Sequence, residues 1–281
     1  MRYKLLAIDV DGTLVSPEDV VADQTAQALR EAGAAGLRVC LATGRSYIET
    51  MPIWRRLGLA RPYEPLVLIG GALVAEPEAG RTLYHRTIDR ELACGFADAL
   101  GEAGFSAMAI VDGWRHGVDY FLAESGDVHS AQRDWFSKMK VRVRRCGNLR
   151  EAADMPDPLR VSAVVPDDRA EAVAAALSAR FDGKLTVRAI VAPNYRVTIV
   201  EAFAAGVDKF QAVRYVAQAY RIGPRQIVAV GDDVNDLAMI RGAGLGVAMA
   251  HAEQSVREQA RAVAEPSLAA FLRRLVAGEF D

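Results

Sequence analysis

The sequence predicts an α/β protein with a parallel-sheet core and a smaller α+β domain inserted into it. Two observations support this prediction. Short apolar runs alternate with helical periodicity at both ends of the chain, whereas the middle shows alternating strands and one amphipathic helix. Apolar runs that alternate with helices are typical of a parallel sheet covered on both faces.

The core strands are expected where apolar runs stop at glycine or polar residues. The first two runs, with the helical segment between them and the break at Gly33 and Gly36, form a β-α-β unit. The third run turns on Gly70 and Gly71. The expected strands lie in KLLAIDV (4–10), RVCLAT (38–43), LVLIGGALV (66–74), QIVAVGDD (226–233) and GLGVAMA (244–250).

Residues 84–190 are expected to form the inserted domain, and residues 1–83 and 191–281 the core. Within the insertion, residues 106–124 predict two paired strands joined by a turn at Asp112-Gly113. The segment 140–146 predicts a short strand, and 167–181 predicts an amphipathic helix.

Composition and charge exclude several classes of protein. The chain has 281 residues, of which 51% are hydrophobic and 25% charged, so it can form an ordinary folded core. Its formal net charge of -2 provides no general attraction for nucleic acid or an anionic membrane. No apolar run approaches the roughly 18 residues of a membrane-spanning helix. We therefore expect a soluble protein that binds a small anionic molecule.

The cysteines and the N-terminal segment indicate the compartment. Cys40, Cys94 and Cys146 lie far apart and form no C-x-x-C pair, so neither a disulfide framework nor a thiolate zinc site is indicated. The first apolar run is too short for a secretion signal and ends in carboxylates. We expect a cytoplasmic protein, either a monomer or a homodimer.

Three clusters of polar residues follow predicted core strands. They are D-V-D-G-T at 9–13, T-G-R at 43–45 and G-D-D-V-N-D at 231–236. Ligands in open α/β sheets bind beyond the carboxyl ends of the strands, so these clusters are candidates for one site. Four carboxylates would then converge, and a hard divalent cation such as Mg²⁺ is the usual way to balance them. These carboxylates belong to Asp9, Asp11, Asp232 and Asp236.

With these motifs the sequence resembles the haloacid dehalogenase-like hydrolases, and within them the Cof-type phosphatases. The resemblance rests on D-V-D-G-T (9–13), A-T-G-R (42–45), G-V-D-K (206–209) and G-D-D-V-N-D (231–236), so it covers both ends of the chain. It implies a Rossmann-like core with an α/β cap domain between the second and third motifs, where the insertion is expected.

The resemblance also implies a role for each matching residue. Asp9 would be the nucleophile that accepts the phosphoryl group as an aspartyl-phosphate, and Asp11 the acid/base that protonates the leaving alcohol and then activates water. Mg²⁺ would bind the carboxylates of Asp9 and Asp232 and the main-chain carbonyl of Asp11, and Asp236 would orient these ligands. The groups expected to hold the phosphate oxygens are the Val10 main chain, Thr43, Gly44, Lys209 and Asn235.

These roles agree with the chemistry of phosphoryl transfer. The transition state spreads charge over the equatorial phosphate oxygens, so cations and N–H donors stabilise it. Lys209 is one of only five lysines among 34 basic residues, so a lysine at this position is informative. A compact ammonium group suits a phosphate that it meets as a point charge.

The inserted domain carries the candidates for substrate recognition. Trp114, Arg115 and His116 could read a substrate, or could form an exposed turn with a packed ring. Two other sets are expected to be structural or surface residues. They are Arg142, Arg144 and Arg145, on a solvated strand face, and His85, His129 and His251, which have no metal-ligand spacing.

Together these features predict a Mg²⁺-dependent phosphatase for a small phosphorylated metabolite, with a sugar phosphate ranked before a nucleotide or cofactor phosphate. One alternative is a phosphomannomutase-like phosphosugar mutase, which returns the phosphoryl group to a sugar. Another is a non-catalytic phosphometabolite sensor, although a sensor has no need of Asp11.

Overall fold

The chain folds as two units that interleave in sequence. The computed structural model describes residues 2–16, 18–60, 64–124, 133, 136, 141–192 and 197–281. One unit comprises Met1–Leu83 with Asp208–Asp281, and the other comprises Tyr84–Val207. The predicted fold class, a parallel α/β core with a smaller α+β insertion, is confirmed.

The first unit is built on a parallel sheet with the strand order β14-β13-β12-β1-β2. The strand β1 lies inside this sheet, paired in parallel with β12 on one side and β2 on the other. All four of its residues are buried, as expected for the apolar sequence LLAI. The strands are β1 (Leu5–Ile8), β2 (Arg38–Leu41), β12 (Ile227–Gly231), β13 (Leu245–Met249) and β14 (Ala262–Ala264).

A second, antiparallel sheet in this unit has the order β3-β4-β5. A single parallel bridge from Ala42 to Val67 joins its first strand to the segment after β2. The short helix η1 (Ile69–Gly71) makes the turn that was expected at Gly70 and Gly71. The strands are β3 (Leu66–Leu68), β4 (Leu73–Ala75) and β5 (Thr82–His85), and β5 carries the chain into the insertion.

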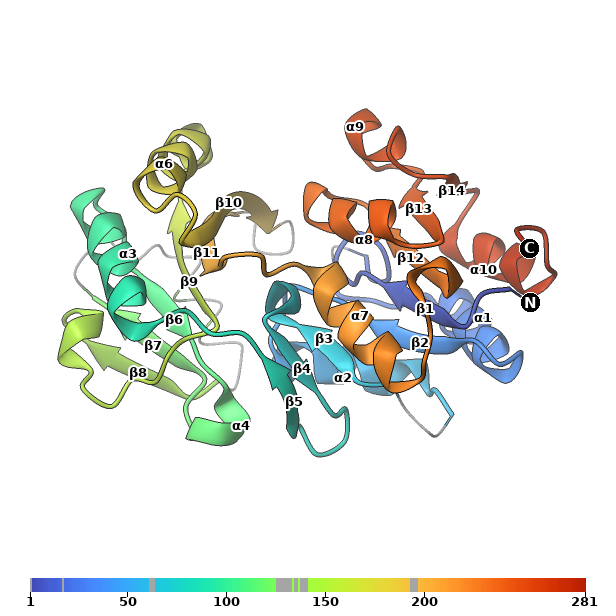
Figure 1. The fold of residues 1–281 in the computed structure, drawn as a ribbon, viewed down its shortest axis with the longest axis horizontal. Helices are drawn as coiled ribbons and strands as arrows, with labels where there is room; N and C mark the ends of the chain where they lie inside the picture. Colours follow the sequence, from blue (N-terminus) through green and yellow to red (C-terminus); the bar gives the residue numbers. More distant parts are fainter. Residues whose placement is uncertain are drawn as a thin grey trace. The chain divides into compact units, whose positions relative to one another are not determined.

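Helices cover both faces of the parallel sheet (Figure 1). The helix α1 packs against α2 and α10, whereas α7 packs against α8 on the other face. These helices are α1 (Asp23–Ala34), α2 (Tyr47–Leu57), α7 (Lys209–Ala219), α8 (Leu237–Gly242), α9 (Gln254–Arg257) and α10 (Leu268–Val276). The short helices η3 (Pro224–Gln226) and η4 (Val234–Asp236) flank β12.

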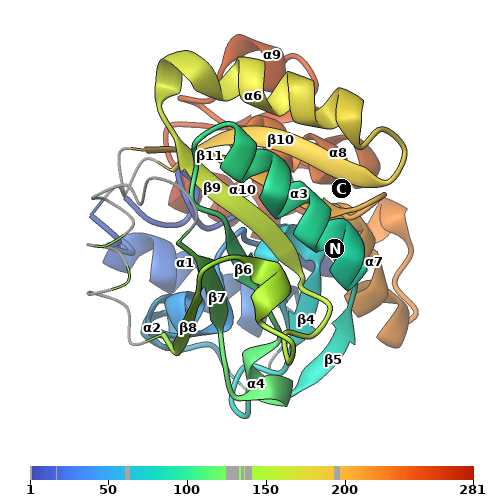
Figure 2. The same cartoon turned by 90° about the vertical axis from the view of Figure 1, so that its left-hand side faces the viewer.

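The inserted unit has its own sheet, in the order β10-β11-β9-β6-β7-β8. The helices α3 and α6 lie on one face of this sheet and enclose a separate hydrophobic core (Figure 2). The strands are β6 (Met108–Ile110), β7 (Tyr120–Ala123), β8 (Val143–Cys146), β9 (Arg160–Val165), β10 (Leu185–Ala192) and β11 (Val197–Ala204). The helices are α3 (Arg90–Glu102), α4 (Gly113–His116), α6 (Asp167–Arg180) and the short η2 (Leu149–Glu151).

Two local expectations for the insertion differ from the structure. The second boundary lies at Val207 and not at 190, because β11 pairs with β10 on one side and β9 on the other and so belongs to the inserted sheet. The strands β6 and β7 do pair, but α4 connects them in place of a turn at Asp112-Gly113. The Asp112 side chain caps α4 by accepting a hydrogen bond from the Arg115 N–H.

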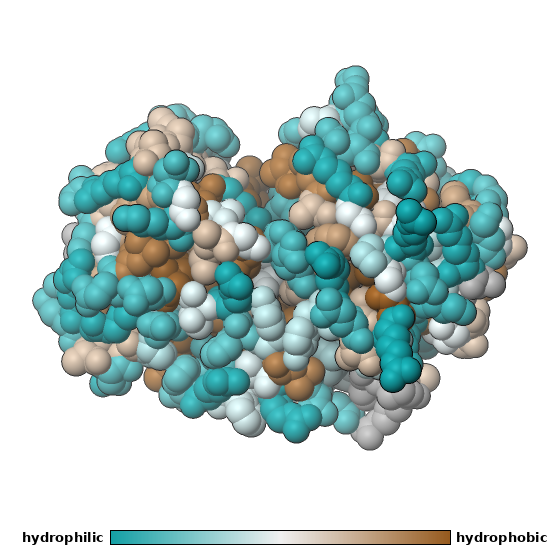
Figure 3. Space-filling model, viewed as in Figure 1, coloured by the Kyte–Doolittle hydropathy of each residue, from teal (hydrophilic) through white to brown (hydrophobic). Residues whose placement is uncertain are grey.

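The face of the molecule shown in Figure 3 is mainly polar. Hydrophilic residues cover most of the face shown in Figure 3, over both units. None of the helices in the described part of the chain has both the length and the apolar character needed to cross a membrane.

Candidate active site

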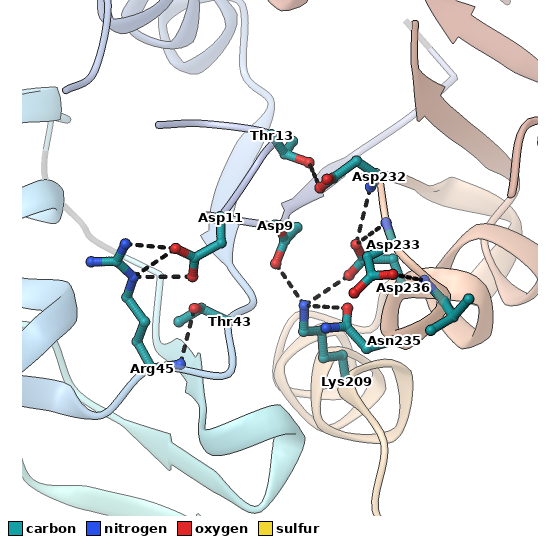
Figure 4. A network of polar contacts seen from close by, with 11 residues as sticks. Asp9, Asp11, Thr13, Thr43, Arg45, Lys209, Asp232, Asp233, Asn235 and Asp236 are labelled. Carbon is teal, nitrogen blue, oxygen red and sulfur yellow. Dashed lines mark hydrogen bonds and ion pairs between the residues drawn. The ribbon is translucent and has the colours of Figure 1, made fainter. Parts of the chain in front are cut away.

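The carboxyl ends of three adjacent strands bring the predicted site residues together. Asp9 follows β1 directly, Asp232 follows β12 directly, and Thr43 lies two residues beyond β2. Because β1 lies between β12 and β2 in a parallel sheet, these segments leave the sheet at the same edge (Figure 4).

The ammonium group of Lys209 is the centre of a first polar network. Lys209 is the first residue of α7, and the Asp208 side chain caps that helix. Its Nζ lies 2.6 Å from Asp9 Oδ1, 2.8 Å from Asp236 Oδ1 and 3.1 Å from Asn235 Oδ1 (Figure 4). The Lys209 side chain is only 1% exposed. The cap of α7 therefore places a buried cation against the end of β1.

Backbone groups and a threonine hold the two aspartates that follow β12. Asp236 is fully buried, and its Oδ2 accepts hydrogen bonds from the N–H groups of Asp232 and Asp233 at 3.1 and 3.3 Å. Asp232 Oδ1 accepts a hydrogen bond of 2.8 Å from Thr13 Oγ1. The loop after β12 is thus tied both to itself and to the loop after β1.

Burial and mutual repulsion shift the pKa values of this cluster. Burial raises the pKa of Asp9 well above its usual value, and the Asp236 carboxylate raises it further against the opposing effect of Lys209. Burial alone would lower the pKa of Lys209, but the carboxylates of Asp236 and Asp9 outweigh it and the pKa is raised. Burial raises the pKa of Asp232 to about 6. Without a further cation, burial in the folded protein therefore disfavours the ionised forms of Asp9 and Asp232, even with Lys209 beside them.

This cluster fits a divalent metal ion. Asp9, Asp232 and Asp236 each offer a carboxylate oxygen, and these oxygens lie within 4.8 Å of one another. When ionised, the three carboxylates and the single ammonium of Lys209 carry a net charge of about -2, which a divalent cation would balance. Carboxylate oxygens are the ligands that Mg²⁺ prefers.

A second polar network holds Asp11. Arg45 Nε lies 3.1 and 3.0 Å from the two carboxylate oxygens of Asp11, and Arg45 Nη2 lies 2.6 Å from Oδ1 (Figure 4). The same Nη2 forms an ion pair with Asp19. The two carboxyl groups of the D-V-D motif therefore contact different cations: Asp9 contacts Lys209, and Asp11 contacts Arg45.

Three of the residues expected to bind phosphate lie beside these networks. The Oγ1 of the buried Thr43 accepts a hydrogen bond of 3.1 Å from the Arg45 N–H. Val10 is buried, and its carbonyl accepts hydrogen bonds from the N–H groups of the two residues at 14 and 15. A Cβ added to Gly44 would meet no atom within 4 Å, so the space beside Gly44 is open.

Sequence reasoning did not assign Arg45 and Thr13, which contact Asp11 and Asp232, or Asp19, which contacts Arg45. Arg45 and Thr13 each lie inside a quoted motif, so their place in the motif was the available signal. Asp19 lies outside the motifs, and nothing in the sequence indicates its contact with Arg45. His251, expected to be a structural or surface residue, is exposed, and its Nε2 lies 3.8 Å from Asp232 Oδ2.

The substrate-recognition candidates Trp114, Arg115 and His116 all lie on α4, in the inserted unit. Trp114 is 57% exposed. Arg115 Nε lies 3.3 Å from Asp112 Oδ2, and His85 Nδ1 lies 4.0 Å from the same oxygen. His129 lies outside the described residues.

The three arginines of residues 142–145 form ion pairs at the surface. Arg142 Nη2 lies 3.0 Å from Asp119 Oδ1, Arg145 Nη1 lies 2.5 Å from Glu124 Oε1, and Arg144 pairs with Asp154. All three arginine side chains are at least half exposed. The expectation that these arginines are solvated is confirmed, but Arg142 precedes β8, and the neighbours Arg144 and Arg145 point to opposite faces of that strand.

The fold and the grouping of the four motifs at one sheet edge agree with the family that the sequence resembles. A family model described as haloacid dehalogenase-like hydrolase matches residues 6–267. The chain therefore belongs to the haloacid dehalogenase-like hydrolases.

Relatives of the chain over most of its length are named as phosphatases. Phosphatase YwpJ of Bacillus subtilis is 27% identical over 277 residues, covering 92% of this chain and 94% of that protein. The 5-amino-6-(5-phospho-D-ribitylamino)uracil phosphatase YitU of the same species is 25% identical, covering 90% of this chain and 89% of that protein. A solved subclass IIB sugar phosphatase has a TM-score of 0.76 and 20% identity, covering 97% of this chain and 98% of that chain. The prediction of a phosphatase of this class is confirmed.

Proposed function

We propose that this protein is a Mg²⁺-dependent phosphatase that hydrolyses a small phosphomonoester through an aspartyl-phosphate on Asp9. The observation that carries this proposal is the position of the Asp9 carboxylate. It lies at the end of β1, in contact with Lys209 and beside two further carboxylates that fit a divalent cation. A carboxylate nucleophile divides one difficult displacement into two easier ones.

The residues that would hold Mg²⁺ are the carboxylates of Asp9 and Asp232 and the main-chain carbonyl of Asp11. When bound, the ion would neutralise the charge of the phosphate and of the surrounding carboxylates. Asp236 is held by Lys209 and by two backbone N–H groups, so it suits the role of orienting these ligands.

The two aspartates of the D-V-D motif divide the chemistry. In the first step, a carboxylate oxygen of Asp9 bonds to phosphorus, the ester oxygen leaves, and Asp11 gives that oxygen a proton. In the second step, Asp11 takes a proton from water while the water oxygen attacks phosphorus, which releases phosphate and restores Asp9. The assigned phosphate-oxygen donors are Lys209, Thr43, Gly44, Asn235 and the Val10 main chain, which suit an anionic transition state.

For the substrate we propose a small phosphorylated metabolite, with sugar phosphates tested first. The solved sugar phosphatase shares the fold, and YitU is named for a phosphoribityl compound. We assign discrimination between metabolites to the inserted unit as a cap domain, and Trp114, Arg115 and His116 are the first candidates for it. The three cysteines are free thiols, as suits a protein of the cytoplasm.

Phosphate release from a panel of phosphorylated metabolites tests this function. We expect inorganic phosphate to appear with Mg²⁺, to stop with excess chelator, and to be absent for Asp9→Asn. Isomerised sugar phosphate without phosphate release would indicate a mutase, and tight binding without turnover would indicate a sensor. Full activity in metal-free buffer would contradict the proposed metal.

A further inference from the structure

Arg45 is a buried cation that has no role in the phosphoryl transfer proposed above. The Arg45 side chain is 7% exposed, although both carboxylates that it contacts are more open, at 34% for Asp11 and 42% for Asp19. Burying a guanidinium group costs free energy unless it is paired and hydrogen-bonded. The burial of Arg45 against two more exposed carboxylates therefore calls for a functional explanation.

The backbone that carries Arg45 is fixed by local hydrogen bonds. Its N–H donates to Thr43 Oγ1, and the next residue, Ser46, is the N-cap of α2. Ser46 and Glu49 form a capping box, in which the side chain of each residue accepts from the backbone N–H of the other. The guanidinium thus extends from a rigid turn between β2 and α2.

Asp19 holds the guanidinium from a second direction. Its backbone has φ +61°, in the left-handed region that residues other than glycine rarely adopt. Hydrogen bonds between Ser16 and Asp19, and between Ser16 and Val20, close the loop that contains it. The Asp19 carboxylate pairs with the same Nη2 that contacts Asp11.

We propose that Arg45, held by Asp19, is a positioning residue that fixes the orientation of the Asp11 carboxylate. The inference rests on the proposed function, in which Asp11 donates and accepts the proton. The Asp11 carboxylate is one third exposed, so several rotamers would be open to it. The Nε and Nη2 donors of the planar Arg45 guanidinium select one rotamer and one orientation of the carboxylate plane. A carboxyl group that is held in the productive orientation does not have to change its rotamer before each proton transfer.

The test measures kcat/KM for phosphate esters with poor and good leaving groups. This constant covers the steps up to loss of the leaving group, and an alkyl phosphate needs protonation there whereas nitrophenyl phosphate needs little. For Arg45→Gln we expect a loss of roughly 10²-fold on the alkyl ester and a much smaller loss on the aryl ester. Arg45→Lys, which keeps the charge but not the fork, should recover only part of the loss.

A double-variant cycle separates positioning from a general structural role. If Arg45 acts through Asp11, then Arg45→Gln should cause little further loss in an Asp11→Asn background. Asp19→Asn should show the same preference for poor leaving groups with a smaller magnitude. The matched control for Asp19→Asn is Glu18→Gln in the same loop. The control for Arg45→Gln is Arg56→Gln. Arg56 lies on α2, the helix that follows Arg45, and this substitution breaks an exposed ion pair with Asp23 of α1.

The outcomes distinguish this inference from the proposed function. If Asp11→Asn shows no loss that depends on the leaving group, the role of Asp11 itself is wrong. If Asp11→Asn does show it, but Arg45→Gln lowers both esters equally or adds fully to Asp11→Asn, the positioning role is overturned and the proposed function stands. Should Arg45→Gln fail to fold, Arg45→Lys and Asp19→Asn give the same comparison, and wild-type behaviour of both would overturn the inference.

Discussion

At the scale of single residues, the D-V-D motif solves a problem of charge. Two carboxylates two residues apart repel each other, and each is stabilised here by a cation of a different kind. Asp9 contacts the compact ammonium of Lys209, and Asp11 contacts the planar guanidinium of Arg45. An ammonium group can be shared between a carboxylate and a phosphate as a point charge, whereas a fork fixes an orientation. The choice of cation therefore matches the different roles proposed for the two aspartates.

Asp232 allows a prediction about stability without metal. Its pKa is about 6 in the folded protein, above the ordinary value of 3.8, so the folded state binds its proton more tightly than the unfolded state does. The protonated Asp232 carboxyl group therefore adds to the free energy of unfolding below pH 3.8, and this contribution is lost as the pH rises through about 6. For metal-free Asp232→Asn we expect a Tm a few degrees above that of the parent at pH 7.5, because the uncompensated charge is gone.

The same variant should lose the rise in Tm that Mg²⁺ gives the parent protein. The measurement is thermal unfolding at several pH values, with and without Mg²⁺. Asp23→Asn, which removes a surface charge from the same unit, is the control and should keep the Mg²⁺ effect. A variant less stable than the parent at pH 7.5 without metal would show that the folded structure does not disfavour this charge.

At the scale of elements, the turn after β1 shapes the site. Gly12 has φ +75°, and a Cβ placed on it would lie 2.2 Å from Asp232 Oδ2. The backbone of the D-V-D-G-T motif thus approaches the Asp232 side chain so closely that only glycine fits at position 12. Thr13 then donates its hydrogen bond to the same aspartate.

This close approach predicts the effect of Gly12→Ala. The left-handed backbone costs an alanine about 1–2 kcal/mol, and the clash would push Asp232 away from its position. Gly36→Ala is the matched control, because Gly36 has φ +92° but no atom within 4 Å of an added Cβ. We expect both variants to lower Tm, and only Gly12→Ala to weaken Mg²⁺ binding, measured as the shift of Tm with Mg²⁺ concentration. Equal weakening in both variants would contradict the account.

The sequence predicted the elements of the core well and those of the insertion less well, for a physical reason. A strand buried on both faces, such as β1, gives a continuous apolar run whose end is visible in the sequence. The strand β11 gives a similar apolar run, but its membership of the inserted sheet depends on its pairing with β9 and β10, which the sequence does not record. The Asp112-Gly113 pair is typical of a hairpin and predicts a turn, whereas in the structure Asp112 caps the helix α4.

At the scale of the whole molecule, the site depends on contacts between distant parts of the chain. Lys209 and Asp9 are 200 residues apart in sequence, and the inserted unit lies between them. The resemblance to the family indicated that these residues would meet, because both lie in motifs that match it. The contacts of Arg45 with Asp11 and Asp19 were not predicted, because they depend on side-chain directions in two loops. Every residue of both polar networks belongs to the first unit, which places the chemistry there.

The central claim is that Asp9 carries the phosphoryl group and that Asp11 is needed to remove it. The most direct measurement is mass spectrometry of peptides from Asp11→Asn, quenched during turnover of nitrophenyl phosphate with Mg²⁺. Because this ester can phosphorylate Asp9 without an acid while hydrolysis of the intermediate needs a base, we predict that one phosphoryl group accumulates on the peptide containing Asp9. The matching Asp9→Asn/Asp11→Asn protein should show none. Turnover without phosphorylation of Asp9, or the same modification in the doubly substituted protein, would contradict the account.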